Sequence, residues 1–178
     1  MRLLLVPSLQ LEDWRAMDRY SRSLARALPD VLPRGWTMSV LPSPAYPSWV
    51  RFPARWLAYP RTIDWTAWDV VHVLDHSYAH MLHRRRPGVR TVLTVHDLYA
   101  FDRSARQPGI RGAFLDRVNR WVLAGARAAD VCMCDSRATL HALTDQFPEL
   151  EPRARWEPLG VDGAVFVPDA AAARRRGR

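Results

Sequence analysis

Short apolar runs alternate with helical patterns along the chain. Runs rich in β-branched and aliphatic residues predict strands at residues 2–6, 37–41, 69–74, 91–95, 131–134 and 153–159. Apolar residues recur at helical spacing over residues 12–28, 111–128 and 136–147, and a further helix is expected after residue 77. Because alternating strands and helices form parallel sheets with right-handed crossovers, the pattern predicts an α/β domain with a doubly wound parallel sheet.

Polar residues follow most of the predicted strands directly. The carboxyl ends of parallel strands meet at one edge of a sheet, and ligands of open α/β sheets bind there. We therefore expect one rim that is lined by Ser8, Ser43, Asp75, His76, His96, Asp97, Asp135, Ser136 and residues 160–162.

His96 and Asp97 are the first candidates for chemistry on this rim. They end the run 91–95, whose unbroken apolar character is typical of a parallel strand buried on both faces. A structural interpretation is also open, in which the histidine is bound by a neighbouring carbonyl and the aspartate caps a turn. This strand alone favours the structural interpretation, so the rest of the chain has to decide.

Residues 43–61 differ in character from the rest of the chain. Four prolines and five aromatic residues are interleaved there with Arg51 and Arg55. The segment is either a loop with a short helix that covers the core, or a flap that binds an acceptor or a membrane interface. Arg15, Arg19, Arg22 and Arg26 form a basic stripe on helix 12–28, which is either a solvated face or a contact for phosphate or membrane.

Composition narrows the class of protein. A chain of 178 residues with 48% hydrophobic content and eight tryptophans folds into one domain with a sizeable core. All 26 basic residues are arginine, and the net charge of +8 favours anionic partners such as nucleotide diphosphates or acidic lipids. Nucleic acid is the least favoured partner, because no recognition motif accompanies the charge.

Histidines and cysteines do not predict a metal site. Four histidines, at positions 72, 76, 80 and 83, run from strand through loop to helix and so do not keep a ligand spacing. Cys132 and Cys134 are the only cysteines, and they are best explained as buried small apolar residues in a reducing cytoplasm. The apolar run that opens the sequence is too short for a signal peptide or a membrane span.

Several motifs of nucleotide and hydrolase chemistry are absent. The first strand is followed by no GxGxxG, which argues against a dinucleotide-binding dehydrogenase. The sequence also has no GxxxxGK[ST] loop and no GxSxG elbow.

Four motifs, in order, resemble the N-terminal domain of family 4 glycosyltransferases. They are WDVVHVLDHSYAH (68–80), TVLTVHDL (91–98), AADVCMCDSRATLHAL (128–143) and PLGVD (158–162). The stretch 12–28 also looks like the first helix of one branch. The resemblance implies one half of a GT-B architecture, in which two Rossmann-like domains face each other, and a hexose transfer from a nucleotide sugar without a cofactor or a bound metal.

The resemblance also implies roles for residues on the rim. His96 would lie beside the donor sugar and stabilise charge near the anomeric carbon, and Asp97 would orient it or its loop. Ser136 and Arg137 would face the cleft, with Arg137 near a phosphate. Asp75, His76 and Ser77 would face the glycan or lipid acceptor, and Ser8, Gly160 and Asp162 complete the predicted substrate-binding residues.

The sequence departs from the family pattern in two places. Residues 8–13, SLQLED, replace a glycine pair that follows the first strand in many members. The chain also stops about where a second domain should begin, so we expect a domain at 1–163, a basic linker-like tail at 164–178 and no donor-binding domain. We expect such a chain to need a donor-binding partner for catalysis. The alternatives are a non-catalytic lipid- or glycan-binding module at the inner membrane face, or a truncated remnant.

Overall fold

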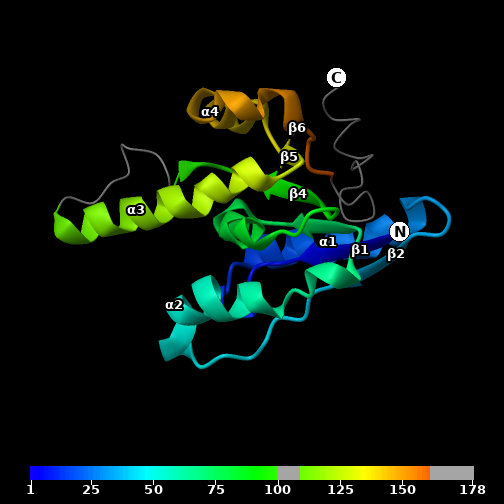
Figure 1. Cartoon of the computed structure of the whole chain (residues 1–178), viewed down its shortest axis with the longest axis horizontal. Helices are drawn as coiled ribbons and strands as arrows, with labels where there is room; N and C mark the ends of the chain where they lie inside the picture. Colours follow the sequence, from blue (N-terminus) through cyan, green and yellow to red (C-terminus); the bar gives the residue numbers. More distant parts are fainter. Residues whose placement is uncertain (100–108, 161–178) are drawn as a thin grey trace, which may run out of the picture.

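A single parallel sheet forms the centre of the molecule. The computed structural model describes residues 1–99 and 109–160 (Figure 1). Its sheet contains six parallel strands in the order β2-β1-β3-β4-β5-β6. The strands are β1 (Arg2–Val6), β2 (Thr37–Val40), β3 (Val70–Val73), β4 (Arg90–Val95), β5 (Val131–Cys134) and β6 (Ala154–Trp156). The predicted α/β fold with a doubly wound, Rossmann-like parallel sheet is therefore confirmed.

Helices connect the strands on both faces of the sheet. The α-helices are α1 (Arg15–Val31), α2 (Arg51–Pro53), α3 (Ile110–Ala124) and α4 (Arg137–Gln146). Short 3₁₀ helices are η1 (Gln10–Glu12), η2 (Ser48–Val50), η4 (Tyr59–Thr62), η5 (Trp65–Ala67), η6 (His76–Arg84), η9 (Gly125–Ala128) and η10 (Pro148–Arg153), and η3 (Ala54–Ala58) is a π-helix. Residues 48–62 are thus a chain of consecutive helical turns.

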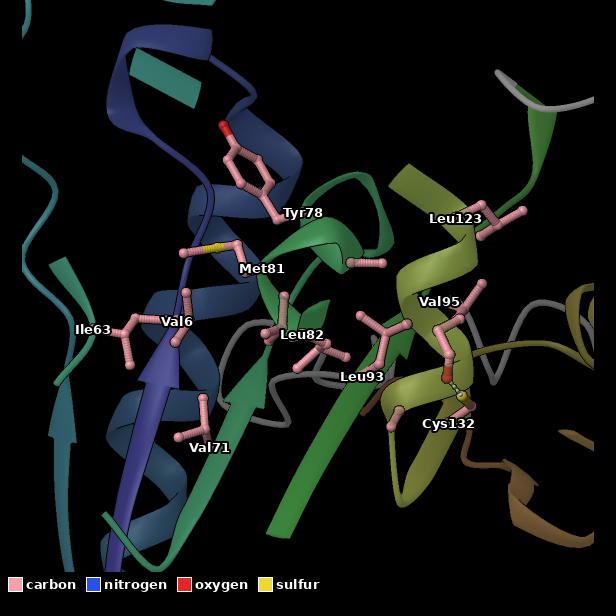
Figure 2. Close-up of a cluster of buried hydrophobic side chains, with 14 of the residues drawn as sticks. Val6, Ile63, Val71, Tyr78, Met81, Leu82, Leu93, Val95, Leu123 and Cys132 are labelled. Atoms are coloured by element: carbon pink, nitrogen blue, oxygen red, sulfur yellow. Dashed lines mark hydrogen bonds between the residues drawn. The ribbon is translucent and has the colours of Figure 1, made fainter. Parts of the chain in front are cut away.

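Alternate residues of the strands face two separate clusters of apolar side chains. Leu3 and Leu5 of β1 pack with Leu24 and Leu28 of α1. On the opposite face a larger cluster joins the central strands to η6 and to the end of α3. Figure 2 shows members of this larger cluster, among them Val6, Val71, Met81, Leu82, Leu93, Val95 and Leu123. Both faces of β1, β3 and β4 are covered, which explains their unbroken apolar sequence.

Several element boundaries differ from the sequence-based expectation, among them those of α1 and β6. Helix α1 begins at Arg15, because residues 10–12 form a separate turn and Asp13 adopts a left-handed conformation with φ of 52°. The helix also continues through Pro29 to Val31, since the φ of proline suits a helix and only one backbone donor is lost. Strand β6 ends at Trp156, because this residue pairs with Cys134, which is the last residue of the neighbouring strand β5.

Gly125 lies where the end of α3 meets η6. The residue is buried, and a Cβ atom there would overlap the carbonyl group of Ala79 and lie 2.9 Å from the backbone nitrogen of His80. Only glycine allows the two backbones to approach this closely. In the described part of the chain, no helix has the length and apolar character that a membrane span requires.

Candidate functional site

The polar residues after β1, β3, β4 and β5 lie along the carboxyl edge of the sheet. Since β2 lies on the other side of β1, the strand order reverses between β1 and β3, and ligands of open α/β sheets bind at such a switch point. Ser8 follows β1 and Asp75 follows β3, and the Ser8 hydroxyl donates to Asp75 Oδ2 at 2.7 Å in a buried contact. The structure therefore brings two of the predicted site residues together.

The side chain of His96 is fixed at the end of β4. Its Nδ1 is 3.1 Å from Asp135 Oδ2, and its Nε2 is 3.0 Å from the carbonyl oxygen of Leu74. The ring of Tyr20, from α1, stands edge-on against the imidazole with the ring centres 4.9 Å apart. The imidazole is only 7% exposed, so its orientation is set by the protein before any ligand binds.

The backbone of His96 is bound as firmly as its ring. The Thr139 hydroxyl of α4 donates to the His96 carbonyl at 2.9 Å, and the His96 N–H donates to His76 Nδ1 at 3.4 Å. Ser136 is the N-cap of α4, because its hydroxyl accepts from the Thr139 N–H at 3.0 Å. The end of β4 and the start of α4 therefore form one hydrogen-bonded unit.

His76 lies in a buried position that disfavours a positive charge on its ring. Burial lowers the pKa of His76, against the opposing effects of Asp75 and Asp97. Its Nδ1 accepts the His96 N–H, which places its proton on Nε2. His76 therefore acts as a hydrogen-bond acceptor towards the loop that carries His96.

Asp97 and Ser77 orient the loops that leave the strands. The exposed Asp97 carboxylate accepts from the Tyr99 N–H at 3.0 Å, so it caps a turn of its own loop. The Ser77 N–H donates to Asp75 Oδ1 at 2.8 Å, and Asp75 thereby becomes the N-cap of η6. The carboxylate that touches the His96 ring belongs to Asp135, and Asp97 contributes to the loop.

Arg137 and Gly160 lie at the β5–β6 end of the rim. The exposed Arg137 guanidinium stacks over the Trp156 ring, 4.4 Å from its centre. Gly160 follows β6 and is exposed, whereas the predicted site residue Asp162 and the predicted tail 164–178 lie outside the described residues. Arg137 is thus placed beside the N-terminus of α4, some way along the rim from Ser8 and Asp75.

The aromatic segment is anchored on the rim by Arg55. This guanidinium donates to the Ser77 carbonyl at 3.0 Å and lies 3.4 Å from Glu12 Oε1. It also stacks between the rings of Trp14 and Tyr78, at 5.1 and 4.8 Å from their centres. The segment therefore covers the switch point between β1 and β3, and the name flap is used below for residues 43–62.

The remaining histidines are engaged separately. His72 Nε2 is 2.8 Å from the Thr94 hydroxyl in the middle of the sheet, and His80 Nε2 is 3.1 Å from the Arg55 carbonyl. Burial lowers the pKa of each of these two histidines to about 4. Within residues 1–99 and 109–160, no three His, Cys, Asp or Glu side chains are grouped so as to hold a metal ion.

Acid is expected to destabilise the fold through His72. Its pKa is lower in the folded than in the unfolded chain, so the unfolded chain binds more protons as the pH falls from 6.5 towards 4. The stabilisation is complete above pH 6.5 and decreases by about 2 kcal/mol by pH 5. Urea unfolding of wild type and His72→Gln at both pH values measures this, and equal pH dependence in the two proteins would contradict it.

The two cysteines are part of the core. Both thiols are free and buried in β5, and burial raises the pKa of Cys132 to about 11 and that of Cys134 to about 12. The interpretation of both as small apolar residues is therefore confirmed.

The sheet with its polar rim and switch point defines a Rossmann-like α/β protein, and proteins of this class bind their ligands at the carboxyl edge of the sheet. The sequence matches the model of Glycosyltransferase Family 4 over residues 16–164. The chain therefore belongs to this family and is a glycosyltransferase domain, whose substrates are a sugar donor and an acceptor. No curated protein matches the chain.

Sequence reasoning missed the partners of the predicted residues. Asp135 and Ser136 were both expected on the rim, but the contact of the Asp135 carboxylate with His96 was not foreseen. Nothing in the sequence marks Tyr20 as the ring that packs on His96. The register of β4 against β5 pairs Val95 with Cys134 and so brings the next residues, His96 and Asp135, side by side. Knowledge of this register would have revealed the contact.

Proposed function

We propose that this chain is the acceptor-side half of a hexosyltransferase with the GT-B architecture. The enzyme transfers a hexose from a nucleotide sugar to a glycan or lipid acceptor, and a donor-binding half, in the same polypeptide or in another chain, completes the cleft. The observation that carries the proposal is the preorganised His96–Asp135 pair at the ligand-binding edge of a family 4 domain.

His96 acts on the donor sugar in this proposal. Asp135 holds Nδ1 and so fixes the plane of the ring, as the third member of a catalytic triad does for its histidine. When the sugar donor binds, His96 Nε2 gives up its hydrogen bond with the Leu74 carbonyl and forms one with a sugar hydroxyl instead. A hydrogen-bonding group that is already fixed beside the anomeric carbon holds the sugar for transfer and needs no reorganisation in the transition state.

Arg137 and the start of α4 serve the phosphates of the donor. The first N–H groups of a helix attract anions, and α4 points its N-terminus at the rim next to His96. Stacking on Trp156 fixes the plane of the Arg137 guanidinium, which leaves its N–H edge available for a bidentate contact with phosphate.

The acceptor binds at the other end of the rim. Ser8, Asp75, His76 and Ser77 lie there beneath the flap, and Asp75 offers a carboxylate already held by Ser8 and by the Ser77 N–H. In the proposed mechanism the Asp75 carboxylate and the loop after β3 orient an acceptor hydroxyl towards the donor sugar.

A lipid-linked acceptor is favoured by the outer surface of the flap. Trp49, Phe52 and Leu57 are exposed by 83%, 53% and 54%, and Arg51 lies among them. Such a surface suits the interface of an anionic membrane, where aromatic rings lie at the headgroup level. A cytoplasmic enzyme at the inner membrane face accords with this surface and with two free thiols.

Vesicle binding tests the flap. Replacement of Trp49, Phe52 and Leu57 by serine is expected to weaken co-sedimentation with anionic vesicles at least about tenfold, because each side chain loses favourable burial. Val31→Ser, at an equally exposed apolar residue at the end of α1, should have no effect. If the triple variant binds vesicles as well as wild type does, the flap is not the membrane contact. If neutralisation of Arg15, Arg19 and Arg22 leaves vesicle binding unchanged, the basic stripe is only a solvated face.

Reconstitution tests the proposed function as a whole. The chain is combined with the donor-binding half of a family 4 enzyme, fused or co-expressed, and release of nucleoside diphosphate and hexose transfer are measured with a panel of nucleotide sugars and lipid or glycan acceptors. Transfer by the pair, with none by either half alone, supports the proposal. A pair that associates and binds donor but transfers no hexose to any acceptor would contradict it.

A further inference from the structure

A polar cavity lies at the amino edge of the sheet, opposite the rim. Its volume is about 210 Å³, and its lining consists of Ile63 and Trp65 together with the polar residues Arg61, Asp64, Thr66, Arg84 and Arg86. Residues 61–66 precede β3, and Arg84 and Arg86 precede β4, so both parts of the lining lie where parallel strands begin. The cavity is therefore separate from the proposed transferase site.

Positive charge in this cavity is only partly neutralised by the described residues. Among the described residues, Arg84 and Arg86 form no ion pair and no side-chain hydrogen bond, and Arg61 donates to the Leu57 carbonyl of its own helix. By contrast, their neighbour Arg85 forms an ion pair with Asp130 at 3.0 Å. Three guanidinium groups thus face one carboxylate, that of Asp64.

Asp64 is occupied by the turn that carries it. Its Oδ1 accepts from the Thr66 N–H at 3.0 Å and from the Thr66 hydroxyl at 2.6 Å. These hydrogen bonds lower the pKa of Asp64, with smaller contributions from Arg86 and Arg2, so the group is ionised. Oδ2 accepts no hydrogen bond from a described residue, which leaves it available to a hydroxyl of a ligand.

We propose that this cavity binds a small phosphomonoester that carries a neighbouring hydroxyl group. Guanidinium forks match the oxygen geometry of phosphate, and the net charge of three guanidinium groups and the Asp64 carboxylate, about +2, balances a phosphomonoester whose charge is close to −2. The hydroxyl donates to Asp64 Oδ2. A cavity of about 210 Å³ is smaller than the ~300 Å³ at which pockets for drug-sized ligands begin, so the ligand is smaller than a nucleotide.

Calorimetric titration of the full chain tests the site. Inorganic phosphate and glycerol 3-phosphate are the soluble probes, and vesicles that contain phosphatidic acid present the same phosphomonoester on a lipid. The double variant Arg84→Gln/Arg86→Gln is expected to bind glycerol 3-phosphate at least about tenfold more weakly, because charge-assisted hydrogen bonds are lost. Arg117→Gln, on an exposed face of α3, is the matched control and should bind as wild type does.

The outcomes separate the sources of the ligand. Binding of glycerol 3-phosphate that exceeds binding of inorganic phosphate, and that Asp64→Asn reduces, supports a soluble metabolite. Binding to phosphatidic acid vesicles alone, lost in the double variant, supports a lipid headgroup as the source. No binding to any of the three probes, or binding that the double variant leaves unchanged, overturns the proposal. Salt-dependent binding of duplex DNA through the same arginines, without binding of glycerol 3-phosphate, would also overturn it.

Discussion

His96→Ala is expected to lower kcat for hexose transfer by the reconstituted enzyme about a thousandfold, with little change in KM for the acceptor. The loss corresponds to removal of one preorganised donor from the transition state, which costs ~10²–10³ in rate in other enzymes. The acceptor subsite beneath the flap does not include the imidazole, so acceptor binding persists. Steady-state kinetics with both substrates varied, alongside thermal unfolding of the variant, separates catalysis from folding.

Two further variants sharpen this test. His141→Ala changes an exposed histidine of α4 and should leave kcat unchanged. Asp135→Asn keeps a side chain of the same shape beside Nδ1 and is expected to lower kcat by less than His96→Ala does, since the ring remains but its orientation is held less firmly. Turnover near the wild-type value in His96→Ala, with the fold intact, would remove His96 from the site.

Gly125→Ala is expected to lower the free energy of unfolding by at least about 3 kcal/mol. A methyl group at this position would overlap the carbonyl carbon and oxygen of Ala79. Both are backbone atoms, which cannot rotate away as the end of a side chain can. The junction of α3, η9 and η6 would have to separate, and apolar contacts of Leu123 and Ala126 with the core would loosen.

Urea unfolding of the 178-residue chain measures this change. Gly160→Ala is the control, because no atom of residues 1–99 or 109–160 lies within 4 Å of the position that its Cβ would occupy. A stability change within about 0.5 kcal/mol is expected for that control. A similarly small change in Gly125→Ala would show that α3 can move away from η6 without loss of packing.

The strands were predictable because burial leaves a direct trace in the sequence. β1 and β5 have the predicted bounds, since each apolar run is bounded by a polar residue or proline where the strand meets solvent or a turn. Helix ends were less predictable. Pro29 was expected to end α1, but one missing backbone donor near a helix end costs less than the packing of Leu24 and Leu28 on β1 provides.

The rim was predictable from topology, whereas its contacts were not. Every parallel strand ends at the same edge, so Ser8, Asp75 and His96 had to lie along it once the fold was known. Which side chain holds His96 depends on the register of β4 against β5 and on the position of α1 over the sheet. Apolar runs do not specify either of these, because a run of similar side chains packs almost equally well in neighbouring registers.

The position of β1 between β2 and β3 has a consequence for the order of folding. The Ser8–Asp75 contact spans 67 residues, whereas the contact between His96 and His76, at the ends of β4 and β3, spans 20. Closing the longer loop costs about 1 kcal/mol more in chain entropy, so β3 and β4 can pair before β1 finds its place. During synthesis the first strand emerges first, yet one of its edges stays open until residue 73 has left the ribosome. A strand that is almost wholly buried in the finished sheet is thus the one exposed to other chains for longest while the protein is being made.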